Sequence, residues 1–125
     1  MQEAVALTGL QLAVLDVIWE HGEASTHDVW STVCDHRPLA LTTVATILSR
    51  LERKNVLLHR REGRHYLYRA TMSREDVRRS KIRELTDTLF DGDPVDLLGH
   101  LVAANGIDDE RRRRIRALLD GRGSQ

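Results

Sequence analysis

ALTTVATILSRLERKN, residues 40–55, runs directly into VLLHRREGRHYLYR, residues 56–69. The first segment predicts a helix over about 41–54, because four apolar residues recur at the spacing i, i+3, i+4 and i+7 and form one stripe. These residues are Val44, Ile47, Leu48 and Leu51. The second segment lacks helical spacing and is rich in residues that favour strands, so it predicts a β-hairpin.

The outer face of the predicted helix is polar and carries little acid. Short hydroxyl side chains near a helix start let the backbone approach base edges, where Thr can bond a base or touch a thymine methyl. Arginine on the same face can reach guanine or phosphate. The candidate DNA-contacting residues of this helix are therefore Thr42, Thr43, Thr46, Arg50 and Arg53, with Ser49 also on the outer face.

The predicted hairpin has a basic tip. Its two strands are joined by Glu62-Gly63, and a glycine supplies the positive φ that a two-residue turn needs. Four side chains that can be cationic gather there, and an anion would relieve their mutual repulsion. They are Arg60, Arg61, Arg64 and His65. Tyr66 and Tyr68, together with Leu58, are expected to anchor the hairpin to the helices.

Charge is distributed unevenly along the chain. The 19 Lys and Arg balance the 19 Asp and Glu overall. Residues 1–36, however, contain six acids and no Lys or Arg, whereas residues 37–69 contain eight bases and two acids, 8 − 2 = +6. This asymmetry indicates an oriented contact with a polyanion, the plainer alternative being a solvated basic face. A helix for a DNA groove followed by a basic hairpin is typical of a winged helix-turn-helix domain.

Two helices are predicted before this segment. Thr8 and Gln11 have the spacing of a capping box, and Gly22 ends the apolar periodicity that follows. Ser25 and Asp28 repeat the capping spacing at the next helix start, and Pro38 lies beyond that helix.

The C-terminal part predicts helices suited to association. One runs from about Ser73 to Phe90, the sequence Asp91-Gly92-Asp93-Pro94 breaks it, and two shorter helices follow. Three short helices cannot bury their apolar stripes alone, whereas pairing with a second copy would bury them. The predicted dimerisation residues are Leu85, Leu89, Leu97, Leu98, Leu101, Val102, Ile115, Leu118 and Leu119. We expect a mainly α fold with a small β-hairpin wing, divided into a DNA-binding domain at 1–72 and a helical dimerisation domain at 73–125.

The chain resembles the penicillinase-repressor (BlaI/MecI/CopY) family. The likeness rests on LTGLQLAVLDVIWEHG with Ile18-Trp19, on TTVATILSRLERKN, and on REGRHYLY, in this order and spacing. It implies a homodimeric repressor that binds a palindromic operator, often built from TACA and TGTA half-sites. It places Thr43, Thr46 and Arg50 on the recognition helix and Arg61 and Arg64 on the wing. Where the family often has Ser-Pro, this chain has Ala40-Leu41, so the start of the helix is expected to be shifted or less well fixed.

The resemblance does not identify the inducing signal. In the penicillinase branch a protease cuts near an Asn-Phe bond, and here His100-Leu101 stands at about that position. The copper-responsive branch uses C-terminal cysteine pairs, and here no cysteine follows Cys34. Neither release mechanism is predicted for this chain.

Other functional classes fit poorly. Cys34 and His36, with His21 and His27, do not match a common zinc-ligand spacing, and no nucleophile elbow or Gly-rich phosphate loop is present in the sequence. No enzymatic activity, cofactor or metal is therefore predicted. The sequence has neither a membrane-length apolar run nor a signal peptide, so a cytoplasmic protein is expected. The remaining alternative is a winged-helix protein-interaction module that docks an acidic partner.

Overall fold

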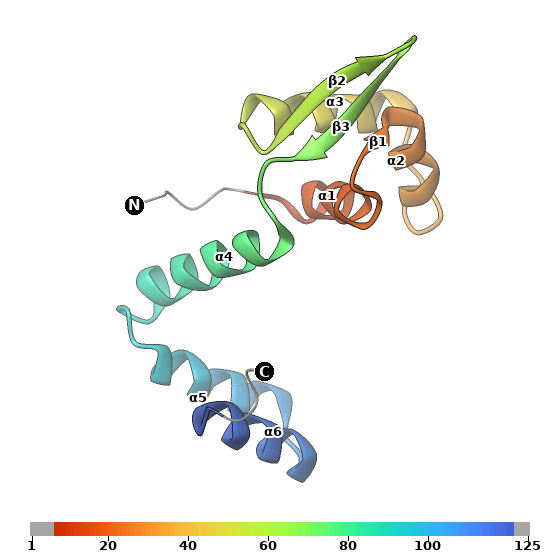
Figure 1. Cartoon of the computed structure of the whole chain (residues 1–125). Coiled ribbons are helices and arrows are strands. Elements are labelled where there is room, and N and C mark those ends of the chain that lie inside the picture. Colours follow the sequence, from red (N-terminus) through yellow and green to blue (C-terminus); the bar gives the residue numbers. More distant parts are fainter. Residues whose placement is uncertain (1–6, 122–125) are drawn as a thin grey trace. The chain divides into compact units, whose positions relative to one another are not determined.

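The computed structural model describes residues 7–121, which form two compact units divided between Lys81 and Ile82. The first unit contains α1 (Gly9–His21), β1 (Ala24–Ser25), α2 (Thr26–Val33), α3 (Leu41–Arg53), β2 (Leu57–Glu62) and β3 (His65–Ala70), shown in Figure 1. Helix α4 (Arg74–Leu89) contains the division, and α5 (Pro94–Asn105) and α6 (Asp109–Leu119) belong to the second unit. The mainly helical fold with a small hairpin is confirmed. The expected domain boundary between residues 72 and 73 stays a prediction.

The first two helices begin as their sequences predict. Thr8 Oγ1 accepts a hydrogen bond from the Gln11 amide, and the Gln11 side chain accepts one from the Thr8 amide. Ser25 and Asp28 form the same reciprocal pair at the start of α2. Each pair satisfies two backbone amides that a helix start leaves unpaired, so both starts are fixed by local sequence.

The hydrophobic core lies in the first unit. It brings together residues of α1, α2 and α3 and of all three strands, and the four apolar residues of the α3 stripe are among them. Its members, each at most 7% exposed, are Val14, Leu15, Val17, Ile18, Ala24, Val29, Val33, Val44, Ile47, Leu48, Leu51, Val56, Leu57 and Tyr68. Burying α3 by this stripe turns its opposite, polar face outward.

Helix α3 has an open start and a well-fixed end. Ala40 is its N-cap, in extended geometry, and no side chain caps the helix there. At the other end, Asn55 has a positive φ of 66°, the Asn55 amide donates to Glu52 O, and the Val56 amide donates to Leu51 O. This is a Schellman motif, with asparagine in the left-handed position that glycine usually takes. It turns the chain sharply from α3 into the hairpin.

The sheet is antiparallel with the strand order β1-β3-β2. Glu62 pairs with His65, so the two turn residues are Gly63 and Arg64 rather than Glu62 and Gly63. Gly63 has φ 63°, while Arg64 does not have a positive φ. Glycine thus supplies the positive φ as predicted, but from the first turn position, as in a type II′ turn.

The pairing register decides which side chains anchor the hairpin. Leu57, His59 and Arg61 pair with Ala70, Tyr68 and Tyr66, so these six residues share one face, which we call the inner face. Leu57 and Tyr68 are buried there. Leu58 lies on the other, outer face and is 44% exposed, so its predicted anchoring role is wrong. Tyr66 is also exposed, so Leu57 and Tyr68 are the anchors.

The last three helices begin at side-chain caps. Ser73 and Asp76 form a reciprocal pair at the start of α4, Asp93 caps α5 with Pro94 in its first turn, and Asp108 caps α6. Gly106, in the left-handed conformation, ends α5. The predicted break at residues 91–94 is confirmed. Across residues 7–121, every helix is too short or too polar to cross a membrane.

Candidate nucleic-acid interface

The outer face of α3 is open to solvent along its whole length. Thr42, Thr43, Thr46, Arg50 and Arg53 are all exposed, as the sequence predicts. The Thr46 hydroxyl donates to Thr42 O at 3.0 Å. This bond holds the Thr46 side chain against the helix and leaves its methyl group and oxygen lone pairs available for a neighbouring molecule.

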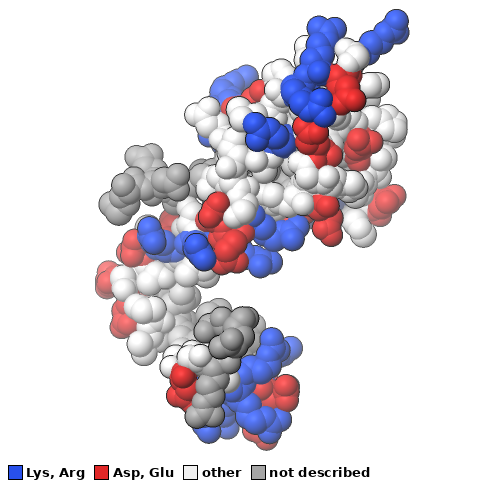
Figure 2. Space-filling view, in the orientation of Figure 1, with Lys and Arg blue, Asp and Glu red and all other residues white. Residues whose placement is uncertain are grey.

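The tip of the hairpin carries exposed cationic side chains. Arg61, Arg64 and His65 are exposed, and the Arg61 Nε donates to Gly63 O at 3.2 Å across the turn. Figure 2 shows basic side chains gathered at this tip, with acidic side chains beside them. The mixture of signs means that the tip is less purely basic than the sequence indicates.

A groove connects the wing to the starts of two helices. Its lining combines wing residues Arg64, His65 and Tyr66 with Ser25, Thr26, His27 and Leu41. Sequence reasoning did not select Thr26 and His27 as site residues. The capping pair places them in the first turn of α2, but their proximity to the wing depends on tertiary packing that no local pattern encodes.

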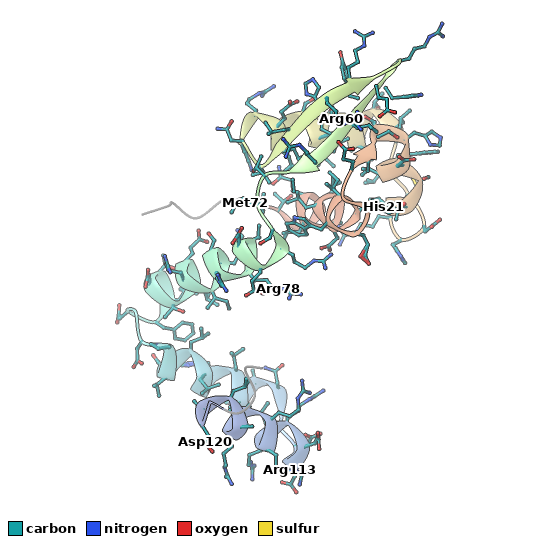
Figure 3. All side chains as sticks on the ribbon, viewed as in Figure 1. His21, Arg60, Met72, Arg78, Arg113 and Asp120 are labelled. Carbon is teal, nitrogen blue, oxygen red and sulfur yellow. The ribbon has the colours of Figure 1, made fainter. Side chains whose placement is uncertain are left out.

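Arg60 differs from its basic neighbours because carboxylates already bind it. Its Nε and Nη2 donate to the two oxygens of Glu23 at 2.8 and 2.9 Å, and Nη2 lies 3.0 Å from a Glu62 oxygen. Figure 3 labels Arg60 beside the sheet. The hydrogen bond with Glu23 raises the pKa of Arg60 above its usual value, and the same bond lowers the pKa of Glu23.

The inner face of the hairpin is tied to the end of α3. His59 Nδ1 contacts a Glu52 carboxylate oxygen, and its ring packs edge-on against Tyr66, with 4.7 Å between ring centroids. The Tyr68 ring lies 5.8 Å from the His59 ring, and burial raises the pKa of the Tyr68 hydroxyl. These contacts fix the wing relative to α3.

The start of α4 is attached to α1. Trp19 Nε1 donates to Met72 O at 2.8 Å, and the Arg74 guanidinium lies over the Trp19 ring at 5.4 Å from the ring centre. Arg74 also pairs with Asp16 at 3.5 Å. These contacts hold the first turn of α4 on the first unit.

The predicted dimerisation residues are mostly exposed in the single chain. Leu97 is buried, and Leu98 and Ile115 are partly buried. The others expose between 37% and 73% of their surface: Leu85, Leu89, Leu101, Val102, Leu118 and Leu119. Within residues 7–121, His, Cys, Asp and Glu side chains form no cluster of three or more that could hold a metal ion.

Three packed helices, a three-stranded sheet with a projecting hairpin and an exposed polar face on α3 define a winged-helix DNA-binding domain. The model of the penicillinase repressor family matches residues 7–121. The chain therefore belongs to the penicillinase repressor (BlaI/MecI/CopY) family, whose members are transcriptional regulators and not enzymes.

Individual relatives agree with this assignment. The chain is 32% identical over 129 residues to the transcriptional regulator BlaI of Mycobacterium tuberculosis, covering all of this chain and 94% of that protein. It is 26% identical to the penicillinase repressor of Bacillus licheniformis, covering 74% and 72% of the two chains. Among solved structures, it is similar to the DNA-binding domain of the repressor BlaI, with a TM-score of 0.54 and 29% identity over 61% of this chain and 93% of that one.

A second solved structure contains nucleic acid. It is the monomeric form of Bacillus licheniformis BlaI in complex with the blaP half-operator. Its TM-score is 0.53 at 29% identity, over 61% of this chain and 93% of that one.

Proposed function

We propose that this protein is a homodimeric transcriptional repressor that binds a palindromic operator with α3 in the major groove and the hairpin on the adjacent backbone. The observation that carries the proposal is the exposed α3 face, with its hydroxyl and guanidinium groups beside a wing that ends in basic side chains. A major groove admits one α-helix, and these groups suit base edges and phosphates.

Each part of the interface has its own role in the proposal. The threonines of α3 contact base edges or thymine methyl groups, and its arginines reach guanine or phosphate. The wing tip contacts phosphates, which position the protein without reading sequence. The residues are Thr42, Thr43, Thr46, Arg50 and Arg53 on α3, and Arg61, Arg64 and His65 on the wing.

Two features support the proposed homodimer: the symmetry of a two-part operator and the exposed apolar surface of the C-terminal helices. The monomeric form of Bacillus licheniformis BlaI is in complex with the blaP half-operator, which supports an operator of two halves for this chain. In this chain, six of the predicted dimerisation residues are exposed on α4, α5 and α6. A two-fold pair of these helices would bury them and present two α3 helices to half-sites related by the same two-fold axis.

The family resemblance supplies the expected half-sites, TACA and TGTA. We infer that the protein acts in the cytoplasm, where it would meet the chromosome. The operator itself is best found by selecting bound duplexes from a random-sequence library with the full chain. Recovery of inverted repeats would support the proposal, whereas recovery of single, unpaired sites would contradict the palindromic operator.

Salt dependence separates DNA binding from docking to an acidic protein. A dimer that neutralises several phosphates should lose affinity with a log-log slope of about −0.9 per phosphate. Binding to the selected duplex is measured between 50 and 200 mM salt, roughly the range over which phosphate contacts dominate. A duplex affinity in the millimolar range at low salt would contradict the proposal and favour the protein-docking alternative.

Two single substitutions distinguish base contacts, which give sequence specificity, from phosphate contacts, which do not. Arg64→Ala should weaken binding to every duplex and flatten the salt slope, because it removes a backbone contact. Thr46→Ala should weaken the selected duplex by about 1–3 kcal/mol while leaving a scrambled duplex unchanged, because it removes a base contact. Fluorescence anisotropy with both duplexes measures the two effects. Wild-type binding by either variant would remove the role assigned to that residue.

A further inference from the structure

Arg60 lies among the basic wing residues, but the charge around it is not basic. Glu23 accepts two hydrogen bonds from it and Glu62 lies 3.0 Å away, so two carboxylates face one guanidinium, while Arg69 also acts electrostatically on the Glu23 carboxylate. A phosphate would have to compete with two carboxylates for the same guanidinium. Arg61, the next residue, donates instead to a neutral backbone carbonyl, Gly63 O.

The ion pair crosses the whole sheet. Ser25 pairs with Leu67, and Leu67 pairs with Arg60, so β3 lies between β2, which carries Arg60, and β1, which Glu23 immediately precedes. Adjacent strands are about 4.8 Å apart, so the contact spans about 10 Å over the outer face. Arginine can bridge this distance and bind both carboxylate oxygens at once.

The backbone alone holds β1 weakly. This strand has only two residues, yet it leads directly into the cap of α2. An exposed ion pair is normally worth little, but bidentate geometry within a charge network is the exception. The Glu23–Arg60 pair therefore adds a side-chain tie where few ladder hydrogen bonds exist.

The two faces of the hairpin are tied to different helices. On the inner face His59 contacts Glu52 of α3, and on the outer face Arg60 binds Glu23, the residue before β1, which leads into α2. Leu57 and Tyr68 anchor the base of the hairpin in the core, whereas the residues nearer its tip are exposed. Ties on both faces would fix the angle of the wing tip relative to α3.

We propose that Arg60 is a positioning residue, which holds the wing through Glu23, and that the neighbouring Arg61 and Arg64 make the phosphate contacts. This inference rests on the proposed DNA-binding function and refines it, since one of the nine side chains selected from sequence acts on the protein and not on the nucleic acid.

The decisive variant is Glu23→Gln, because the two roles predict opposite signs. If Arg60 positions the wing, Glu23→Gln weakens binding to the selected duplex by up to about fivefold. If Arg60 contacts phosphate, removing Glu23 frees the guanidinium and tightens binding. Fluorescence anisotropy at several salt concentrations measures both affinity and slope. Tighter binding would overturn the proposal.

Variants of Arg60 itself provide a second test of whether this residue positions the wing or contacts phosphate. Arg60→Gln should keep the wild-type salt slope, whereas the matched control Arg61→Gln should flatten it by about 0.9 for each phosphate that the protein no longer neutralises. Arg60→Lys should behave like Arg60→Gln, because lysine keeps the charge but cannot form the two parallel bonds. In a double-mutant cycle, Glu23→Gln combined with Arg60→Gln should be no weaker than either single variant. The positioning role would be refuted if the affinity losses of the two single variants multiplied in the double variant. It would also be refuted if Arg60→Gln flattened the salt dependence of binding.

A spectroscopic measurement tests the tie without DNA. In the ¹⁵N-labelled full chain, the Arg60 Nε–H should give a resonance distinct from those of exposed arginines, and Glu23→Gln should abolish the distinction. Adding the selected duplex should leave the signal in place. If the free wild-type protein showed no distinct Arg60 Nε–H resonance, the ion pair would be disproved. If the wild-type chain bound no duplex, the proposed function would be disproved instead.

Discussion

The two units place their apolar side chains in opposite ways. All fourteen members of the hydrophobic core belong to the first unit, where helices and sheet close over them. Among the described residues of the second unit, Leu97 is the buried hydrophobic side chain, while Leu89 and Leu119 are 71% and 73% exposed. The first unit therefore has its own core, whereas the second exposes apolar surface that, in the proposed homodimer, a second copy would cover. Changes that break a core and changes that break an interface should be separable by experiment.

The largest effect is expected from Leu48→Ala. Leu48 is fully buried between α3 and its neighbours, so its truncation should lower the free energy of unfolding of the first unit by about 2–5 kcal/mol. Trp19 and Trp30, the two tryptophans of the chain, both lie in this unit, so their fluorescence reports its unfolding in urea. The loss in free energy of unfolding should not depend on protein concentration.

Leu118→Ala is the matched control, because this side chain is 58% exposed. The tryptophan-monitored transition should stay within about 0.5 kcal/mol of wild type, as for a surface substitution. A loss equal to that of Leu48→Ala would show that the second unit contributes to the core of the first, and the contrast between the two units would fail.

The next largest effect is expected from Leu101→Glu. If Leu101 meets its counterpart across a two-fold interface, the variant places two carboxylates in apolar surroundings at a cost of about 3 kcal/mol or more. The dimer dissociation constant should rise at least about 100-fold, and half-sites should be bound weakly. Sedimentation velocity measures the change.

Leu58→Glu controls for exposed leucine in general, since Leu58 and Leu101 are 44% and 48% exposed. It lies on the outer face of the wing and should leave the oligomeric state unchanged. If the Leu101→Glu variant stayed dimeric, or if Leu58→Glu lost the dimer, the proposed interface on α5 would be wrong.

The contrast between short-range and long-range information also explains which features the sequence predicts. Helix starts depend on residues three positions apart, so the caps at Thr8, Ser25 and Asp93 follow from sequence alone. The turn position of Gly63 does not, because glycine can occupy either central position of a two-residue turn and pairing decides between them.

Other features depend on tertiary contacts. Leu57 and Leu58 are chemically alike, and only the register of the strands buries one and exposes the other. Arg60 binds Glu23, 37 residues earlier in the chain, as well as the nearby Glu62, so this side chain is already paired in the structure. The exposed residues of α3, by contrast, follow from a single helical period and are found where that period places them.

The smallest effect concerns the start of α3, the one helix that faces the proposed ligand. Ala40 has φ −71° and ψ 148°, a geometry that suits a capping serine, but alanine offers no oxygen to the amides of the first turn. Ala40→Ser should therefore raise the free energy of unfolding of the first unit by about 1 kcal/mol, while Thr8→Ala on α1 should lower it by a similar amount. Tryptophan fluorescence in urea measures both.

Equal stabilities for Ala40→Ser and wild type would mean that other contacts already compensate for the missing cap. A gain in stability accompanied by weaker operator binding would mean instead that the open start of α3 serves DNA recognition.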